Sequence, residues 1–167
     1  MKLARFLRHR WLDERDAVRA LGADALARIQ ARVAQSELRH SGEIRVCVEA
    51  GLPLSYLRRD ATARERAVTL FGKLRVWDTE NNNGVLIYLL LAERCIEIVA
   101  DRGLNQRVSE AQWRALLGGM AAAFKAGQFE SGLMQAVDGV DGLLAQHFPL
   151  REGEVNPNEL PDAPLVI

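Results

Sequence analysis

The sequence contains few of the residues from which simple catalytic and metal sites are built. In 167 residues there are only two cysteines and three histidines. Cys47 and Cys95 lie in separate strand-like runs without C-x-x-C spacing, which favours buried, reduced thiols over a disulfide or a metal site. His9, His40 and His147 are scattered along the chain, which favours surface or helix-end positions over metal ligation.

Familiar active-site motifs are missing as well. The sequence has no G-x-S-x-G elbow, no Walker motif, no H-E-x-x-H zinc motif and no G-x-G-x-x-G dinucleotide fingerprint. We therefore expect no nucleotide cofactor. No catalytic residue can be assigned on this basis, so an enzymatic role is the less favoured interpretation.

Long hydrophobic runs are absent. The longest, Val85 to Ala92, has eight residues, whereas a membrane-spanning helix needs about 20. We expect no transmembrane segment and, because no continuous apolar region follows the basic N-terminus, no secretory signal. These features predict a cytoplasmic protein, with possible peripheral attachment to the inner face of the membrane.

Charge of one sign does not dominate the chain, whose net charge is zero. Four of the 22 basic residues lie in the first 12 positions, which leaves 18 bases against 22 acids in the remainder. An acidic body of this kind repels nucleic acid, so we expect no nucleic-acid partner.

Residues 1–22 form an N-terminal amphipathic helical extension in our interpretation. Apolar and basic side chains occupy opposite helical faces. Such a helix either contacts an anionic membrane surface weakly through residues 1–12, or packs its apolar stripe on the domain or a partner. The apolar set is Leu3, Phe6, Leu7 and Trp11, and the basic set is Lys2, Arg5 and Arg8.

Residues 23–149 carry the pattern of one α/β domain. Helical periodicity predicts helices from Asp24 to about Arg39, over 60–75, from Ser109 to Gly127, and onward to Pro149. The run "EIRVCVEA" alternates as a strand, "VLIYLLL" is typical of a strand buried on both faces, and "CIEIVA" completes a hairpin with it. We interpret Arg64, Glu65 and Arg66 as a solvated helix face, and Gly118 and Gly119 as positions of close backbone packing.

Residues 150–167 form an extended, Pro-rich C-terminal tail without helical or strand periodicity. The element order predicts a three-layer α/β/α sandwich with a small mixed central sheet, preceded by the N-terminal helix and followed by this tail.

The predicted hairpin brings polar residues to one sheet edge. Folding it about Glu93 places Asn83 level with Asp101, and a helical crossover that makes the first two strands parallel adds Glu43. Oxygen donors of this kind suit Ca²⁺ or Mg²⁺ rather than zinc, and Arg102 could hold an anion. Asparagine and glycine also favour ordinary turns, which is the alternative interpretation. The oxygen donors of the edge are Glu43, Asp78, Glu80, Asn81, Asn82, Asn83 and Asp101.

The runs "SGEIRVCVE", "LFGKLRVWDTENNNGVLIYLLL", "IEIVADRGL", "FKAGQFESGL" and "LLAQHFP" resemble, in order and spacing, the TPM domain, over about residues 20–150. The closing "NELPD" resembles the short soluble bacterial branch of that family. The resemblance implies an α/β/α fold and Ca²⁺, less readily Mg²⁺, bound by loops at one sheet edge. It implies Asp78, Asn83 and Asp101 as metal ligands, with Glu43, Asn82 and Arg102 behind them or binding an anion.

Two functions follow from the resemblance. The first is a non-enzymatic binding module that takes a divalent cation and acts with a membrane-associated partner, either a LemA-like protein or a secreted TPM neighbour. The second is a weak metal-assisted acid phosphatase acting on phosphomonoesters. "WLDERD" is at best a partial match to the Asp-containing segment that precedes the first helix in secreted members, so a site that uses this early aspartate is not predicted.

Overall fold

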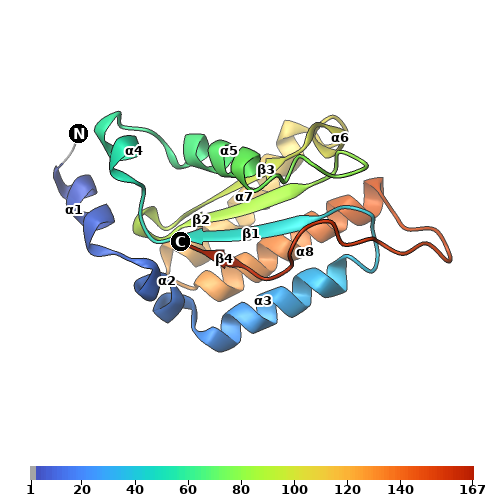
Figure 1. Cartoon of the computed structure of the whole chain (residues 1–167), viewed down its shortest axis with the longest axis horizontal. Helices are drawn as coiled ribbons and strands as arrows, with labels where there is room; N and C mark the ends of the chain where they lie inside the picture. The colour runs from blue at the N-terminus through green and yellow to red at the C-terminus, as the bar shows by residue number, and fades with distance from the viewer. Residues whose placement is uncertain (1–2) are drawn as a thin grey trace.

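A four-stranded mixed sheet forms the middle layer of the molecule (Figure 1). The computed structural model describes residues 3–167. The strands are β1 (Ile44–Glu49), β2 (Val85–Leu90), β3 (Cys95–Ala100) and β4 (Leu165–Val166). They are ordered β3-β2-β1-β4, with β1 parallel to β2 and β4, and β3 antiparallel to β2. The parallel pairing of β1 with β2 and the hairpin of β2 with β3 are both as expected.

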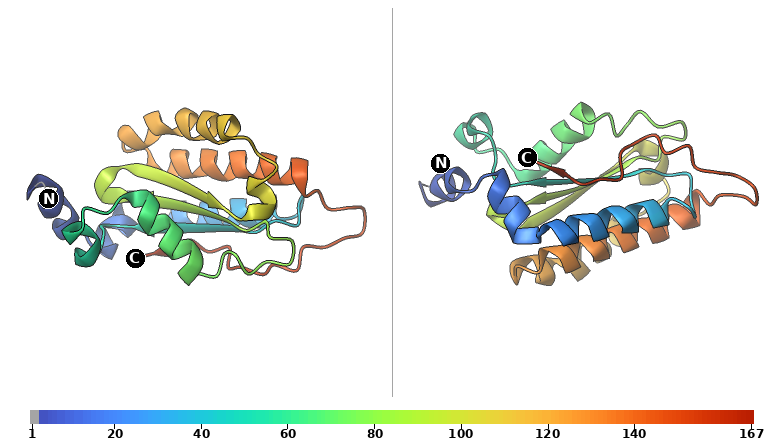
Figure 2. Two further views of the ribbon diagram at one scale, coloured as in Figure 1. Left: turned by 90° about the horizontal axis from the view of Figure 1, so that it is seen from above. Right: turned by 60° about the horizontal axis from the view of Figure 1, so that its bottom comes forward.

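Helices cover both faces of the sheet (Figures 1 and 2). One face packs against α3 (Ala23–Ser36), α7 (Glu110–Lys125) and α8 (Phe129–His147), and the other against α5 (Ala63–Lys73) and the short α4 (Leu54–Arg58). Because β1 and β2 are central, every side chain of both strands is buried. This arrangement confirms the three-layer α/β/α sandwich. Within residues 3–167, no helix has the length and apolar composition needed to cross a bilayer.

The N-terminal extension contains two helices rather than one, α1 (Leu3–Trp11) and α2 (Glu14–Leu21). The helix is interrupted before Asp13, which caps α2. The Asp13 carboxylate accepts from Asp16 N at 3.1 Å, and Asp13 N donates to the Asp16 carboxylate at 3.1 Å. This reciprocal capping box starts a new helix. Gly22, at φ 84°, ends α2 and caps α3, so α3 begins before the expected Asp24. Lys2 of the predicted basic face lies outside the described residues.

The interpretation of Arg66 as part of a solvated face is wrong. Its guanidinium is buried between α5 and the sheet, with Nη2 2.7 Å from Oε1 of Glu49. Tyr88 donates its hydroxyl to the other Glu49 oxygen at 2.6 Å. The alternation in "EIRVCVEA" predicts a polar face for the strand that includes Glu49. Because helices cover both sides of β1, its acidic side chain must find a buried partner.

The interpretation of Gly118 and Gly119 as close packing positions is also wrong. A β-carbon at either position would meet no atom within 4 Å. The close approach of α7 and α8 occurs at Gly139, where a β-carbon would lie 2.0 Å from the Leu116 side chain, and at Gly132, where it would meet the Phe124 ring.

The C-terminal tail is attached to the sheet rather than free of it. It runs back along the edge of β1 (Figure 1) and ends as β4, which had not been expected. Arg45, which is buried, donates from Nη1 to the Pro161 carbonyl at 2.8 Å. Ile167 N donates to Val48 O at 2.9 Å, and Ala50 N donates to Ile167 O at 2.8 Å. The tail therefore completes the sheet next to residues 23–149.

Candidate functional site

Three strand ends meet at one edge of the sheet, as expected from the hairpin. Val85 N donates to Glu43 O at 2.8 Å, and Asp101 N donates to Gly84 O at 2.9 Å. These bonds continue the register that pairs Ile44 with Val85 and Val85 with Ala100. They place the backbones of Glu43, Gly84 and Asp101 side by side.

Asp101 is the predicted metal ligand whose surroundings best fit that role. It caps α6 (Arg102–Asn105), a one-turn helix not anticipated from the sequence, with Oδ1 accepting from Arg102 N at 2.7 Å. Its other oxygen, Oδ2, is buried and has no hydrogen-bond partner among the described residues. A buried carboxylate oxygen without a donor is costly unless a proton, water or cation satisfies it.

Two backbone carbonyls lie against the first turn of α6, the helix that Asp101 caps. The loop 79–84 lies against the first turn of α6, where Gly103 N donates to Asn82 O at 2.9 Å. A β-carbon at Gly103 would lie 2.4 Å from Asn82 O and 2.9 Å from Asn81 O. Asn82 adopts the left-handed conformation, φ 51°, which directs its carbonyl toward α6. Carbonyl and carboxylate oxygens together form the ligand type that Ca²⁺ prefers.

The other predicted metal ligands point elsewhere. Asn83 is fully buried and donates from its amide nitrogen to Ser41 Oγ at 3.2 Å, while its Oδ1 has no hydrogen-bond partner among residues 3–167. Asp78 lies at the surface, where it pairs with Arg75 at 2.9 Å. Among residues 3–167 no hydrogen bond joins Asp78, Asn83 and Asp101, and no three acidic, histidine or cysteine side chains cluster as metal ligands. A cation at Asp101 would therefore rely on backbone oxygens and water.

Two of the three residues expected behind these ligands, Glu43 and Arg102, differ in environment. Glu43 is fully buried, and its Oε2 accepts from Leu160 N of the tail at 3.0 Å, while Oε1 has no described partner. Burial raises the pKa of Glu43. Arg102 is exposed at the start of α6. Glu43 therefore holds the tail, whereas Arg102 faces solvent.

A second carboxyl, Glu37 at the end of α3, has its pKa raised to about 8 by burial and by the nearby acids Glu43 and Asp162. The ordinary pKa of a glutamate is 4.5, so the unfolded chain releases this proton near pH 4.5. Between pH 4.5 and about 8 the folded protein still carries the proton and the unfolded chain does not. The stability supplied by this proton is present at low pH and is lost as the pH rises through about 8.

We expect the Glu37→Gln variant to lose less stability than the parent as the pH rises. Because one pKa unit corresponds to about 1.4 kcal/mol, and the folded pKa of about 8 lies two units above pH 6, the parent should lose roughly 3 kcal/mol more than the variant between pH 6 and 9. Urea unfolding at several pH values measures this difference. Parallel pH profiles for the two proteins would contradict it.

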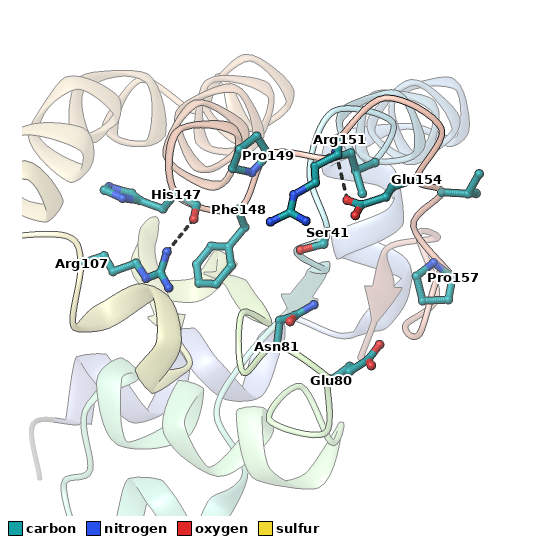
Figure 3. A pocket seen from close by; sticks show the side chains of 12 residues that line it. Ser41, Glu80, Asn81, Arg107, His147, Phe148, Pro149, Arg151, Glu154 and Pro157 are labelled. Carbon is teal, nitrogen blue, oxygen red and sulfur yellow. Dashed lines mark hydrogen bonds between the residues drawn. The ribbon is translucent and has the colours of Figure 1, made fainter.

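An open pocket of about 720 Å³ adjoins the same edge. Figure 3 shows Arg151 reaching between Phe148 and Ser41, with Asn81 on the opposite wall. Arg107 stacks 4.4 Å from the centre of the Phe148 ring and donates to the His147 carbonyl at 2.7 Å. The sequence did not reveal this pocket, because its walls come from segments far apart in the chain: Ser41, the loop 79–84, the α6–α7 turn, the end of α8 and the tail.

Comparison with known proteins places the chain in a family. The family model of the TPM domain matches residues 15–143. The chain belongs to the TPM domain family. Among solved structures, this TPM domain is similar to the NMR structure of BA42 protein from the psychrophilic bacterium Bizionia argentinensis, with 29% identity and a TM-score of 0.75. The likeness covers 87% of this chain and 94% of that one. A comparison with curated proteins found no match.

Proposed function

We propose that this TPM domain is a non-enzymatic binding module that takes Ca²⁺ at the sheet edge. The observation that supports the proposal is Asp101 Oδ2, a buried carboxylate oxygen without a hydrogen-bond partner in the described chain. Asp101 caps the helix whose first turn contacts the carbonyls of Asn81 and Asn82. Asn83 and Asp78, the other ligands that the resemblance implies, contact Ser41 and Arg75 instead, so the proposal rests on Asp101. When bound, the ion would join the loop 79–84 to the start of α6.

The resemblance also implies the type of partner. We propose that the module acts with a membrane-associated protein, either a LemA-like protein or a secreted TPM protein. A bound cation would make the edge loops rigid and would offset their negative charge, so partner binding at this edge should depend on Ca²⁺.

Thermal unfolding with EDTA, Ca²⁺, Mg²⁺, Mn²⁺ or Zn²⁺ tests the cation site. A ligand present at about 100 times its Kd stabilises the fold by roughly 2.7 kcal/mol, which should raise the Tm by several degrees. We expect the largest shift with Ca²⁺ and a smaller one with Mg²⁺, which tolerates irregular oxygen geometry poorly. The absence of a shift with every ion would refute the proposal.

Two variants locate the ion. Asp101→Asn keeps an oxygen that can cap α6 but removes the charge, and it should abolish the Ca²⁺ shift while leaving the metal-free protein folded. Asp78→Asn is the matched control, because Asp78 is held by Arg75 at the surface and should contribute little. A shift that survives in Asp101→Asn but not in Asp78→Asn would move the site to Asp78.

A weak metal-assisted phosphatase is the second candidate function. The observation that favours it is the pocket beside the edge, to which Arg107 and Arg151 contribute guanidinium groups suited to a phosphate. A bound cation would polarise the phosphoryl group. Hydrolysis of p-nitrophenyl phosphate should then require metal and fall in both Asp101→Asn and Arg151→Ala. A turnover rate that is unchanged in both variants would point to a contaminating enzyme.

A further inference from the structure

Helix α1 is attached to the domain by its polar side. Arg5 forms ion pairs at 2.8 Å with Glu93 and with Asp60. Buried His9 accepts from Leu52 N at Nδ1, 3.0 Å, and its Nε2 lies 3.0 Å from Glu93. Since Nδ1 accepts, the ring proton sits on Nε2 and donates to the carboxylate. These contacts fix the rotation of α1 about its own axis.

The apolar stripe of α1 consequently faces outward. Leu3 is 70% exposed, Leu7 43% and Trp11 82%, and of the predicted apolar set only Phe6 is partly buried against the core. The spacing of four residues places the three exposed side chains on one face of the helix. Packing of this stripe on its own domain is therefore not what the fold adopts, which leaves a membrane surface or a partner from the sequence-based alternatives.

The charge around the stripe is positive. Arg8 and Arg10 are exposed on α1, and the helix contains no acidic residue. Leucine and tryptophan beside arginine form the side-chain set of helices that lie at the interface of an anionic bilayer. The helix also lies at one extremity of the molecule (Figure 1), where it can reach a flat surface.

We infer that the face formed by Leu3, Leu7 and Trp11 is a docking surface for anionic lipid headgroups. The leucines and the indole enter the headgroup region, while Arg8 and Arg10 contact lipid phosphates. Because only three apolar side chains take part, attachment is weak and reversible. This inference does not depend on the cation site.

Docking in this way determines how the domain is presented. Glu93, which holds α1, lies between β2 and β3 at the opposite end of the hairpin from Gly84 and Asp101. Strand β2 has six residues, so these ends are separated by about 20 Å. A membrane-docked molecule therefore directs its candidate cation edge away from the lipid, toward other proteins.

Co-sedimentation of the whole protein with vesicles tests the inference. Vesicles of phosphatidylcholine alone are compared with mixed vesicles that contain phosphatidylcholine and phosphatidylglycerol in equal amounts, each at low and at high salt. We expect binding to the mixed vesicles that weakens with salt. Trp11→Glu should weaken binding to the mixed vesicles about tenfold or more. Arg8→Ser should weaken binding about fivefold, and only to the mixed vesicles, because an arginine near an anionic surface contributes roughly 1 kcal/mol. Leu38→Glu, at an exposed leucine elsewhere, is the matched control and should bind as the parent.

The emission of Trp11, read in a Trp77→Phe/Trp113→Phe background, reports directly on insertion and should shift to the blue with mixed vesicles. Failure to bind any vesicle, or equal binding by the parent and Trp11→Glu, would overturn the inference. A concentration-dependent dimer abolished by Trp11→Glu would overturn it too, since the face would then belong to a second copy of the chain. Thermal unfolding of Trp11→Glu confirms that the variant is folded.

Discussion

Replacing Arg66 by methionine should lower the free energy of unfolding by about 3–5 kcal/mol, because removing one partner of a buried ion pair leaves the other charge unpaired. Arg66 donates from Nε and Nη2 to the carboxylate of Glu49, and both side chains are at most 10% exposed. Burial and the nearby Glu49 raise the pKa of Tyr88, so its hydroxyl stays protonated and remains a donor to Glu49.

Urea unfolding measures this loss, and a second substitution tests its cause. Adding Glu49→Gln to Arg66→Met removes the unpaired charge but keeps an acceptor for Tyr88, so the double variant should recover part of the lost stability. Arg114→Met is the control, since Arg114 forms an exposed ion pair with Glu110 and its replacement should change stability little. A double variant no more stable than Arg66→Met would show that the unpaired carboxylate is not the cause.

The sequence predicted the arrangement of the strand ends because local patterns determine it. The short connection between "VLIYLLL" and "CIEIVA" requires a hairpin, and the hairpin brings Asn83 and Asp101 to one edge whatever the helices do. A helical crossover from β1 to β2 requires parallel strands, and this added Glu43. These rules act on the backbone, so they placed residues but not the directions of their side chains.

Side-chain partners depend on tertiary contacts that no local pattern reveals. Arg66 and Glu49 belong to different layers, and helical periodicity alone assigns a charged residue to the solvent side. Asp78 was grouped with Asp101 because both lie near the edge, but Arg75, three residues away, is its described partner. The break between α1 and α2 was the exception. Asp13 and Asp16 have capping-box spacing, and this signal in "WLDERD" could have been recognised.

The orientation of α1 and the course of the tail have a common physical origin. Glu93 lies in the turn between β2 and β3, and Arg45 lies in β1. Each of these charged residues is satisfied by a terminal segment: Glu93 by Arg5, and Arg45 by the Pro161 carbonyl. Buried polar groups must find partners, so they determine where otherwise unpatterned chain ends attach. Attachment of α1 through Arg5 and His9 leaves its apolar face free for a surface outside the molecule.

Replacing Gly84 by alanine should destabilise the fold by about 3 kcal/mol and should also remove any ion binding at the edge. The added β-carbon would lie 1.9 Å from the carbonyl oxygen of Val76 and 3.0 Å from its carbon. Since these are backbone atoms, no rotamer change relieves the clash, and either the loop after α5 or the start of β2 must move. Asp101 N donates to Gly84 O, so a displacement is transmitted to the candidate ligand.

Gly118→Ala is the matched control for this substitution. A β-carbon there meets no atom within 4 Å, and the position is exposed on α7, so alanine should stabilise the protein by about 1 kcal/mol through its helix propensity. Urea unfolding of both variants and their thermal shifts with Ca²⁺ provide the comparison. If Gly84→Ala were as stable as the parent, the approach of Val76 to the strand end would not be needed to hold the edge. If it were destabilised but still bound Ca²⁺ with the affinity of the parent, the ion would have to be held by groups independent of the Gly84–Asp101 bond.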